Sequence, residues 1–293
     1  MTGREAKAKF QGCYVATLTP FDGTDRLDTG VVSAHAQWLV EHGIQGLCPA
    51  GTTGEFLYLT DDEKRRLIKA TVDAVKKRVP VIAGVWAARP AAIADLARAA
   101  ENAGADAVFL QTPIYYPVND DAMFAYYAAV REATSLPVFA YSIPQYAANE
   151  ISLACLERLL NAGVVVGIKD SSGKAERVGE LVRRFGDAAV VFAASDSFAS
   201  QGRKLGADGF ISAIANVAPG LFARLWAGDE SLQAAVNELR HTLKQVGSIP
   251  ALKMLLALHG FAFGASRLPF SSPTAEQQER LKAVSIPAVQ ASA

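Results

Sequence analysis

A lysine at the end of an apolar segment is the residue of this sequence best suited to covalent chemistry. Residues 163–173 read GVVVGIKDSSG, so valines and an isoleucine precede Lys169 and a polar turn follows it. An apolar run between glycines predicts a strand that is buried on both faces. A lysine amine that burial keeps neutral can attack the carbonyl of a 2-oxo acid and form an iminium, which then acts as an electron sink. The segment therefore predicts a Schiff-base lysine at a strand end.

Lys169 also has a purely structural interpretation. It could cap the strand at the surface, or it could pair with the adjacent Asp170. Successive side chains of a strand point to opposite faces, which disfavours that pair. A lysine at the end of a buried strand needs either a use or a partner for its amine.

Polar residues follow most of the other apolar segments too. The expected strands are 12–20, 44–50, 79–85, 106–111, 137–141, 163–169, 189–193 and 208–212. At or after their carboxyl ends lie Thr17, Thr19, the turn Gly51-Thr52-Thr53-Gly54-Glu55, Thr112, Tyr115, Tyr116, Tyr141, Lys169, Ser171, Asp196, Ile211 and Ser212. All of these except Ile211 are polar or belong to a glycine turn. This pattern, more than any single motif, predicts a binding site at one edge of the sheet.

Several of these positions keep two interpretations. The turn 51–55 is either a tight connection whose glycines supply positive φ, or a nest of hydroxyls and amides for a carboxylate. Tyr141 on its own fits a rim aromatic with a solvated hydroxyl. Tyr115 and Tyr116 could pack under Pro117. Asp196 on its own fits a helix cap.

Helical segments alternate with the strands throughout residues 12–212. The expected helices are 28–42, 60–77, 90–104, 120–133, 152–162, 174–185 and 197–205. Eight strands in alternation with these helices, and with the helices expected after residue 219, favour parallel strands and a TIM (β/α)8 barrel. The competing doubly wound open sheet usually has a glycine-rich turn after its first strand. Here residues 19–22 read TPFD and contain no glycine, which disfavours that fold.

Further helices are expected at 232–246, 250–259 and 275–283. They are too many for the last helix of a barrel, so we divide the chain into a barrel (1–222) and a C-terminal helical extension (223–293) packed on it. Lys253 lies on an apolar helix of this extension, where a paired or snorkelling side chain is expected. The four histidines show no pairing pattern and are not expected to bind a metal.

The composition is that of a globular protein without an unusual partner. The chain has 293 residues, of which 51% are hydrophobic and 20% charged, and its 29 basic residues match its 29 acidic ones. This balance argues against nucleic-acid binding, and no apolar stretch approaches the roughly 20 residues of a membrane span. Cys13, Cys48 and Cys155 are scattered and without metal-ligand spacing, so we expect buried thiols and a cytoplasmic location.

The chain resembles the class I lyases and aldolases of the dihydrodipicolinate synthase/N-acetylneuraminate lyase family, from about residue 12 to about residue 219. Three signatures carry the resemblance: GTTGE at 51–55, YSIP at 141–144 and GIKDSSG at 167–173. A fourth is GADG at 206–209, followed by Ile211, Ser212 and Asn216.

The resemblance implies a barrel protomer in a homotetramer, a dimer of dimers, that needs no metal or organic cofactor. Lys169 would form the Schiff base with pyruvate or a larger 2-oxo acid, and Tyr141 would shuttle protons with Thr52 orienting it. Substrate binding would involve Gly51, Thr53, Ser171, Asp196 and the backbone of Ile211. Tyr115, or alternatively Tyr116, would reach across the dimer interface and contribute to the site of the neighbouring subunit.

Departures from the family patterns bear on the substrate. The synthase pattern has an arginine where Tyr146 stands, and that arginine helps to hold a dicarboxylic partner. The sialic-acid lyase pattern has an acidic residue where this chain has Ser197, and a serine where it has Ala213. In the tyrosine motif, Ser142 stands where asparagine is common. Tyr146 and Phe56 together predict a pocket that is more aromatic than charged.

The leading hypothesis is therefore a Schiff-base lyase, aldolase or dehydratase that acts next to a lysine iminium. The first alternative is a 4-hydroxy-tetrahydrodipicolinate synthase, which joins pyruvate and aspartate semialdehyde. An alternative of another class is a non-catalytic barrel that binds a 2-oxo acid, although a binder needs no amine nucleophile.

Overall fold

The computed structural model of the chain describes residues 1–284. The eight strands within them are β1 (Gly12–Ala16), β2 (Gly46–Cys48), β3 (Ile82–Gly84), β4 (Ala107–Gln111), β5 (Val138–Ser142), β6 (Gly167–Asp170), β7 (Val190–Ala193) and β8 (Gly209–Ser212). The α-helices that accompany them are α1 (Gly3–Lys9), α2 (Thr29–Glu41), α3 (Asp61–Val75), α4 (Pro90–Ala103), α5 (Asp120–Ala133), α6 (Leu153–Asn161), α7 (Ala175–Phe185), α8 (Ala199–Lys204) and α9 (Pro219–Ala227). Within the described residues, no helix is both long enough and apolar enough to cross a lipid bilayer.

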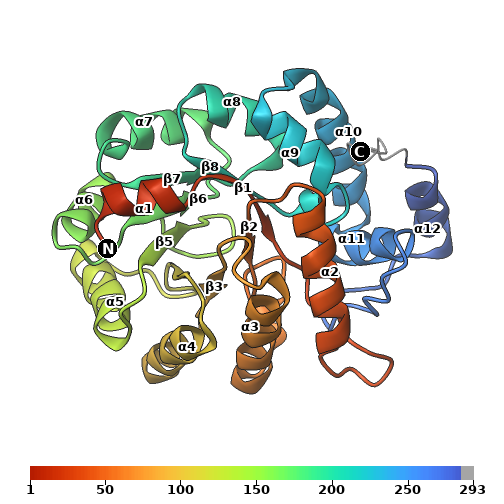
Figure 1. Ribbon diagram of the computed structural model, residues 1–293, viewed down its shortest axis with the longest axis horizontal. Helices are drawn as coiled ribbons and strands as arrows, with labels where there is room; N and C mark the ends of the chain where they lie inside the picture. Colours follow the sequence, from red (N-terminus) through yellow and green to blue (C-terminus); the bar gives the residue numbers. More distant parts are fainter. Residues whose placement is uncertain (285–293) are drawn as a thin grey trace.

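The strands are parallel and close into a barrel surrounded by helices (Figure 1). Their order is β2-β1-β8-β7-β6-β5-β4-β3, and the two end strands meet at an isolated parallel bridge between Leu47 and Val81. Across the same seam the Leu47 N–H donates to Pro80 O (3.0 Å). The prediction of a TIM barrel is confirmed, and the alternative of a doubly wound open sheet is wrong.

Local signals explain where the helices begin. The Asp28 carboxylate accepts hydrogen bonds from the first turn of α2, and Thr60 and Glu63 form a reciprocal capping box at α3. Most expected strands are longer than the observed ones, whereas β5 has the expected length and is displaced by one residue. β1 ends at Ala16 and not at residue 20, and the eighth expected segment begins one residue late, at Gly209.

Buried side chains form two layers, one inside the barrel and one between the strands and the helices. Aromatic rings such as Phe109, Phe139 and Phe192 fill the inside. β6 serves both layers because alternate residues of a strand face opposite sides. Ile168 belongs to the outer layer, whereas Lys169 approaches the Phe109 ring of the inner one.

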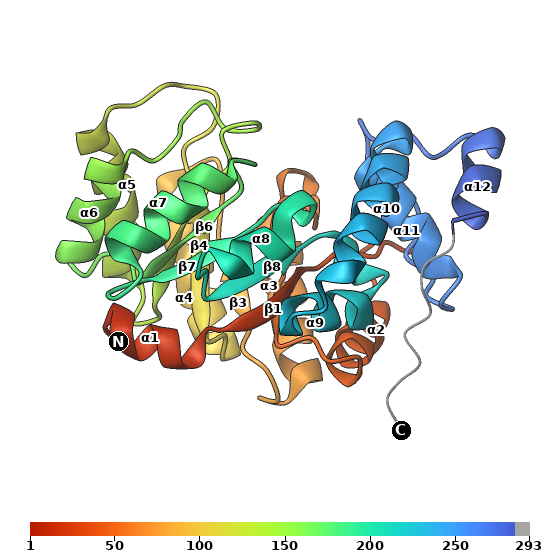
Figure 2. The ribbon, with the colours of Figure 1, turned by 90° about the horizontal axis from the view of Figure 1, so that it is seen from above.

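The first helix lies outside the elements expected from the sequence, which begin at residue 12. α1 has one buried residue, Ala6, and it is followed by the fully buried Phe10. The Phe10 ring meets Phe139 edge-on inside the barrel, with 5.2 Å between centroids. α1 thereby covers the amino-terminal end of the barrel, on the opposite side from α10–α12 (Figure 2).

The chain after the barrel forms α10 (Gln233–Val246), α11 (Ser248–Ala257) and α12 (Ala275–Lys282), close to the ranges expected. The side chain of Gln233, the first residue of α10, donates to Asp196 O (2.9 Å) in the loop after β7 and accepts from the Ser200 N–H (3.0 Å). The extension is thus attached beside a strand end that the sequence analysis assigned to the site. The division at residue 222 remains a proposal, and α9 spans that position.

Candidate active site

Lys169 lies inside the barrel at the end of β6. Its side chain is almost fully buried, with 4% of the residue exposed. Asp170 points to the other side of the strand, where its carboxylate accepts from Arg177 Nε at 2.8 Å. The structural interpretation of Lys169, as a surface cap or a partner of Asp170, is therefore wrong.

The Lys169 amine faces aromatic rings and no carboxylate. Its Nζ lies 4.0 Å from the ring centroid of Tyr141 and 5.3 Å from that of Phe109. Two other lysines are equally buried, and both have oxygen partners: Lys64 Nζ donates to a backbone carbonyl at 3.0 Å, and Lys253 pairs with a carboxylate at 2.5 Å. Within residues 1–284, Lys169 alone of these three forms no hydrogen bond or ion pair. Its amine is therefore free for chemistry.

Tyr141 is held directly beside Lys169. The two residues are register partners on the paired strands β5 and β6, and Tyr141 is only 2% exposed. Its hydroxyl lies 3.3 Å from Thr52 Oγ1, so each hydroxyl can donate to the other. The interpretation of Tyr141 as a solvated rim aromatic is wrong. A buried phenol with a hydroxyl partner, next to an amine, can relay protons.

The turn 51–55 leaves two consecutive amides unused. The Gly54 and Phe56 N–H groups both donate to Gly51 O, whereas the N–H groups of Thr52 and Thr53 donate to no atom of the described residues. Both residues line a cavity, so water or a ligand oxygen can accept from these amides. These amides and the Thr53 hydroxyl fit a carboxylate-binding nest.

Glycines do not supply the positive φ of this turn, contrary to the structural interpretation. The positive values belong to Ala50 (58°) and Glu55 (58°). Gly54 is needed for close approach, because a Cβ there would lie 3.0 Å from Thr17 O. The Gly54 carbonyl in turn accepts from Thr19 Oγ1 at 2.7 Å, which anchors the turn to the loop after β1.

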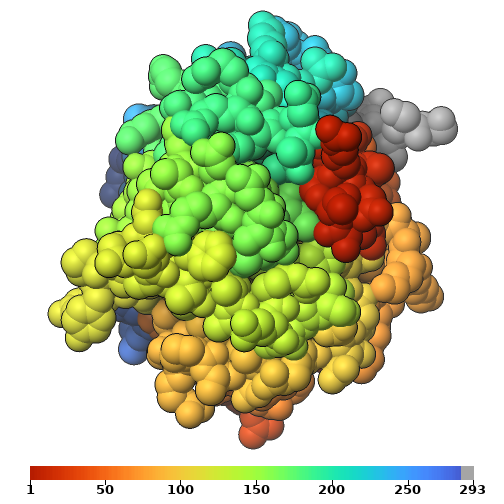
Figure 3. Space-filling model, turned by 90° about the vertical axis from the view of Figure 1, so that its left-hand side faces the viewer, coloured from red at the N-terminus to blue at the C-terminus, as the bar shows by residue number. Residues whose placement is uncertain are grey.

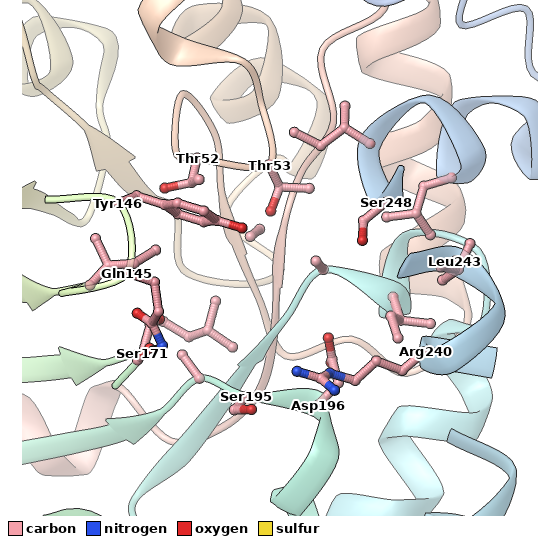
Figure 4. Close-up of a pocket in the computed structure, with 18 of the residues that line it drawn as sticks. Thr52, Thr53, Gln145, Tyr146, Ser171, Ser195, Asp196, Arg240, Leu243 and Ser248 are labelled. Carbon is pink, nitrogen blue, oxygen red and sulfur yellow. Dashed lines mark hydrogen bonds between the residues drawn. The ribbon is translucent and has the colours of Figure 1, made fainter. Parts of the chain in front are cut away.

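Lys169 lines a cavity of about 290 Å³ at the carboxyl ends of the strands. Figure 4 shows other residues around this cavity. The cavity brings together seven of the predicted site residues: Lys169, Tyr141, Thr52, Thr53, Ser171, Asp196 and Ile211. Gly51 lies behind them as the carbonyl acceptor of the turn. The convergence predicted from the strand ends is therefore observed in space, while the chemical role of each residue remains a proposal.

Asp196 is a hydrogen-bond acceptor in the cavity and not a helix cap. It begins the short 3-10 helix η2 (Asp196–Phe198), and its Oδ1 accepts from Ser212 Oγ at 2.5 Å. Burial raises the pKa of the Asp196 carboxyl to about 6, although the hydrogen bond from Ser212 and the charge of Arg240 act in the opposite direction. The carboxyl is suited to bind a substrate hydroxyl.

Tyr115 does not join the other predicted residues in this chain. It lies in the loop after β4, is 81% exposed, and meets the 72% exposed Tyr116 edge-on. Its φ is +76°, a strained value for a residue with a side chain. The yellow part of the chain, which includes this loop, projects at the edge of the molecule in Figure 3.

The sequence analysis missed the charged part of the cavity. Arg240 and Lys244 from α10 line it together with Tyr146. The expected pocket, more aromatic than charged, is therefore wrong at this end. Phe56 lines a neighbouring cavity of about 490 Å³, which shares Tyr146 with the first. No motif marked Arg240, because it lies far from the strand ends in the sequence.

Two further expectations concern residues outside the cavity. The paired role of Lys253 is confirmed by its ion pair with Glu55. The three cysteines are buried free thiols, as expected. Within residues 1–284, histidine, cysteine and acidic side chains form no group of three that could hold a metal ion.

A parallel eight-stranded barrel with a buried lysine, a tyrosine and a hydroxyl turn at one mouth has the architecture of a Schiff-base lyase. The model of the dihydrodipicolinate synthetase family matches residues 9–286. The chain belongs to this family and is a class I lyase, which confirms the recognition made from the sequence motifs.

Individual relatives are similar to this chain over most of its length. An uncharacterized DapA-like lyase of Halobacterium salinarum is 36% identical over 280 residues, which cover 93% of this chain and 92% of that protein. A 4-hydroxy-tetrahydrodipicolinate synthase of Rhizobium meliloti is 38% identical over 215 residues, 73% of each chain. The crystal structure of the Acinetobacter baumannii dihydrodipicolinate synthase complexed with pyruvate is 30% identical, with a TM-score of 0.87 over 93% of this chain and 96% of that one.

Proposed function

We propose that this protein is a Schiff-base lyase, an aldolase or a dehydratase, that acts on pyruvate or a larger 2-oxo acid through Lys169. The observation that carries the proposal is the buried Lys169 amine, 4.0 Å from the centre of the Tyr141 ring and without a protein partner. Burying an amine without a hydrogen-bond acceptor or a counter-charge destabilises the fold. That such an amine is present at a strand end therefore indicates a chemical use.

The proposed first step forms the iminium. Lys169 Nζ bonds to C2 of the 2-oxo acid, the carbonyl oxygen takes up protons, and it leaves as water. The Tyr141 hydroxyl, 3.3 Å from Thr52 Oγ1, delivers and removes these protons. The free amides of Thr52 and Thr53 bind the carboxylate next to the reacting carbon.

The iminium then allows a bond at the neighbouring carbon to change. When the bond from C3 to C4 breaks, its electron pair enters the enamine, the C4 hydroxyl loses its proton, and an aldehyde leaves. In condensation the same steps run backwards. In dehydration C3 loses a proton to form the enamine, and the C4 hydroxyl then takes up a proton and leaves as water. Ser171, Asp196 and the Ile211 backbone line the cavity around this position and would bind the remainder of the substrate.

The test is reductive trapping. We expect pyruvate with borohydride to add a reduced pyruvyl group to Lys169, located by mass spectrometry of peptides. Lys64 and Lys253 are internal controls, because they are equally buried but paired, and they should stay unmodified. No adduct with pyruvate or with larger 2-oxo acids would overturn the proposal. An adduct without any turnover would favour the non-catalytic binding barrel.

The synthase activity is the second candidate, because curated relatives such as the Rhizobium meliloti protein carry that name. Tyr146 weighs against it, since an uncharged ring cannot bind a carboxylate bidentately as an arginine does. A coupled assay with pyruvate and aspartate semialdehyde decides between the candidates. Turnover at a rate typical of an enzyme, about 1 s⁻¹ or more, would establish the synthase.

We also propose the homotetramer, with Tyr115 lent across a dimer interface. Two features support an interface at this loop: the exposed pair of Tyr115 and Tyr116, and the strained backbone of Tyr115. The subunit number is tested by light scattering after gel filtration.

A further inference from the structure

The cavity above Lys169 has a wall that the barrel does not supply. α10 and α11 contribute Arg240, Leu243, Lys244 and Ser248 to its lining. In Figure 4, Arg240 and Ser248 lie on one side of the cavity, and Tyr146 lies on the other. The substrate portion that leaves the barrel mouth must therefore meet the helical extension.

Arg240 is partly buried, yet its guanidinium forms no hydrogen bond or ion pair within residues 1–284. Arg131, Arg177 and Arg267 are partly buried too, and each donates to a protein oxygen at 2.6 to 2.8 Å. A guanidinium carries five N–H donors, and those of Arg240, in the cavity lining, have only water or a bound molecule as acceptors. The contrast indicates that Arg240 is kept for an acceptor that is not part of the chain.

The neighbours of Arg240 strengthen this argument. Lys244 stands one helical turn further on, also lines the cavity, and has no carboxylate partner in the described part of the chain. Like charges four residues apart on a helix repel each other, so an anion between them stabilises both. Asp196 is the acidic residue of the cavity lining, and the charge of Arg240 acts on the pKa of its carboxyl. However, Ser212 occupies one of the Asp196 oxygens, and Arg240 and Asp196 form no ion pair among the described residues.

We propose that Arg240, assisted by Lys244, binds an acid group at the end of the substrate that is far from the iminium. The inference rests on the proposed function, which puts the 2-oxo acid carboxylate at the Thr52–Thr53 turn. Between the two ends, the Asp196 carboxyl and the Ser248 hydroxyl offer partners for substrate hydroxyls. The cavity therefore fits a hydroxylated 2-oxo diacid, which cleaves to pyruvate and an aldehyde that carries a carboxylate.

The experiment compares matched substrates that differ only in the far end. We expect kcat/KM for 2-oxo-3-deoxy aldarates, which end in a carboxylate, to exceed that for 2-oxo-3-deoxy aldonates, which end in a neutral hydroxymethyl group. Arg240→Ala should lower kcat/KM for the diacid about 10- to 100-fold, mainly through KM, which is the usual cost of losing a charged hydrogen bond. The monoacid should be unaffected, and Arg240→Lys should retain part of the preference.

Two controls separate this inference from the proposed function. Pyruvate trapping at Lys169 should proceed equally in wild type and Arg240→Ala, and the exposed Arg203, outside the cavity lining, gives a matched variant, Arg203→Ala, without effect. Binding without turnover is measured as the rise in Tm that each compound causes in Lys169→Met. A missing adduct overturns the proposed function alone. Equal binding and equal turnover of diacid and monoacid, or an Arg240→Ala loss shared by both, overturns the acid subsite.

Discussion

At the scale of single residues, the contact between Tyr141 and Thr52 is the point on which proton transfer depends. Tyr141→Phe keeps the ring against Lys169 and removes only the hydroxyl that lies 3.3 Å from Thr52 Oγ1. We expect kcat to fall about 10²- to 10⁴-fold, the usual contribution of a positioned acid or base. The measurement is kcat with the best 2-oxo acid found in a substrate screen.

Thr52→Val is the matched control for this prediction, since it removes the partner hydroxyl and leaves the phenol. Its loss of kcat should be smaller than that of Tyr141→Phe, with unfolding midpoints near wild type for both. If Tyr141→Phe kept full kcat, the proton-relay role of Tyr141 would be refuted.

The raised pKa of Asp196 gives a prediction for stability. The ordinary value of an aspartate is 3.8, and burial raises the pKa of the folded state to about 6. Between these values the folded state binds more protons than the unfolded state, so the contribution of Asp196 to stability falls as pH rises. We expect wild type to lose about 1 kcal/mol relative to Asp196→Asn between pH 5 and pH 7.5.

This prediction is checked by urea unfolding of both proteins at the two pH values. Asn cannot titrate, so the difference between the proteins isolates Asp196. A difference that stays constant with pH, or that changes in the opposite direction, would show that the carboxyl is not destabilised by burial.

The sequence located the inner part of the site well, because the chemistry lies at strand ends. An apolar strand followed by a polar residue is visible in one dimension, and a parallel barrel brings such ends together. This reasoning found Lys169, Tyr141 and the turn 51–55. It could not find Arg240, which approaches the cavity from a helix whose docking depends on tertiary contacts such as that of Gln233 with the β7 loop.

At the scale of elements, the turn 51–55 is joined to α11 by a buried ion pair. Lys253 Nζ lies 2.5 Å from Glu55 Oε1, and the two side chains are 1% and 0% exposed. Glu55 Oε2 also accepts from the Arg267 N–H at 2.9 Å. The pair thus connects the barrel turn with the extension, and it holds Glu55 at its positive φ of 58°.

Breaking this pair on one side should be costly. Lys253→Met leaves the Glu55 carboxylate buried without a cation, and we expect a loss of about 3–5 kcal/mol in the free energy of unfolding. The double variant Glu55→Gln/Lys253→Met removes both charges and should recover part of that loss. Guanidinium unfolding of the three proteins measures both effects. A single variant as stable as wild type would show that the pair contributes no structural linkage.

The misinterpretations at this scale have physical causes. The seven residues of α1 read GREAKAK, with one buried side chain, so no apolar periodicity reveals the helix. Positive φ is usually assigned to glycine, but in the turn 51–55 Gly54 is required for close approach and Glu55 adopts the left-handed conformation. Such strain is maintained by surrounding contacts, which a sequence pattern does not reveal.

At the scale of the whole molecule, a single chain holds all but one of the proposed catalytic groups. Lys169, Tyr141 and Thr52 line the cavity, whereas Tyr115 is 81% exposed on the β4–α5 loop. Large exposed aromatic pairs on a strained loop are typical of contact surfaces. The proposed tetramer would complete each site with the Tyr115 of a neighbouring subunit.

Mixing two inactive variants tests this arrangement directly. In a dimer of Lys169→Ala with Tyr115→Phe, one site has both defects, and the other combines an intact Lys169 with an intact Tyr115 from the partner. About half of randomly mixed dimers are hybrids, and one of the two sites in each hybrid is intact. Activity should therefore return to about one quarter of that of wild type. The activity is measured after unfolding the two variants together and refolding them, with each variant refolded alone as the control. If Tyr115 acted within its own chain, no hybrid site would be complete, and the mixture would stay at the average of the two variants.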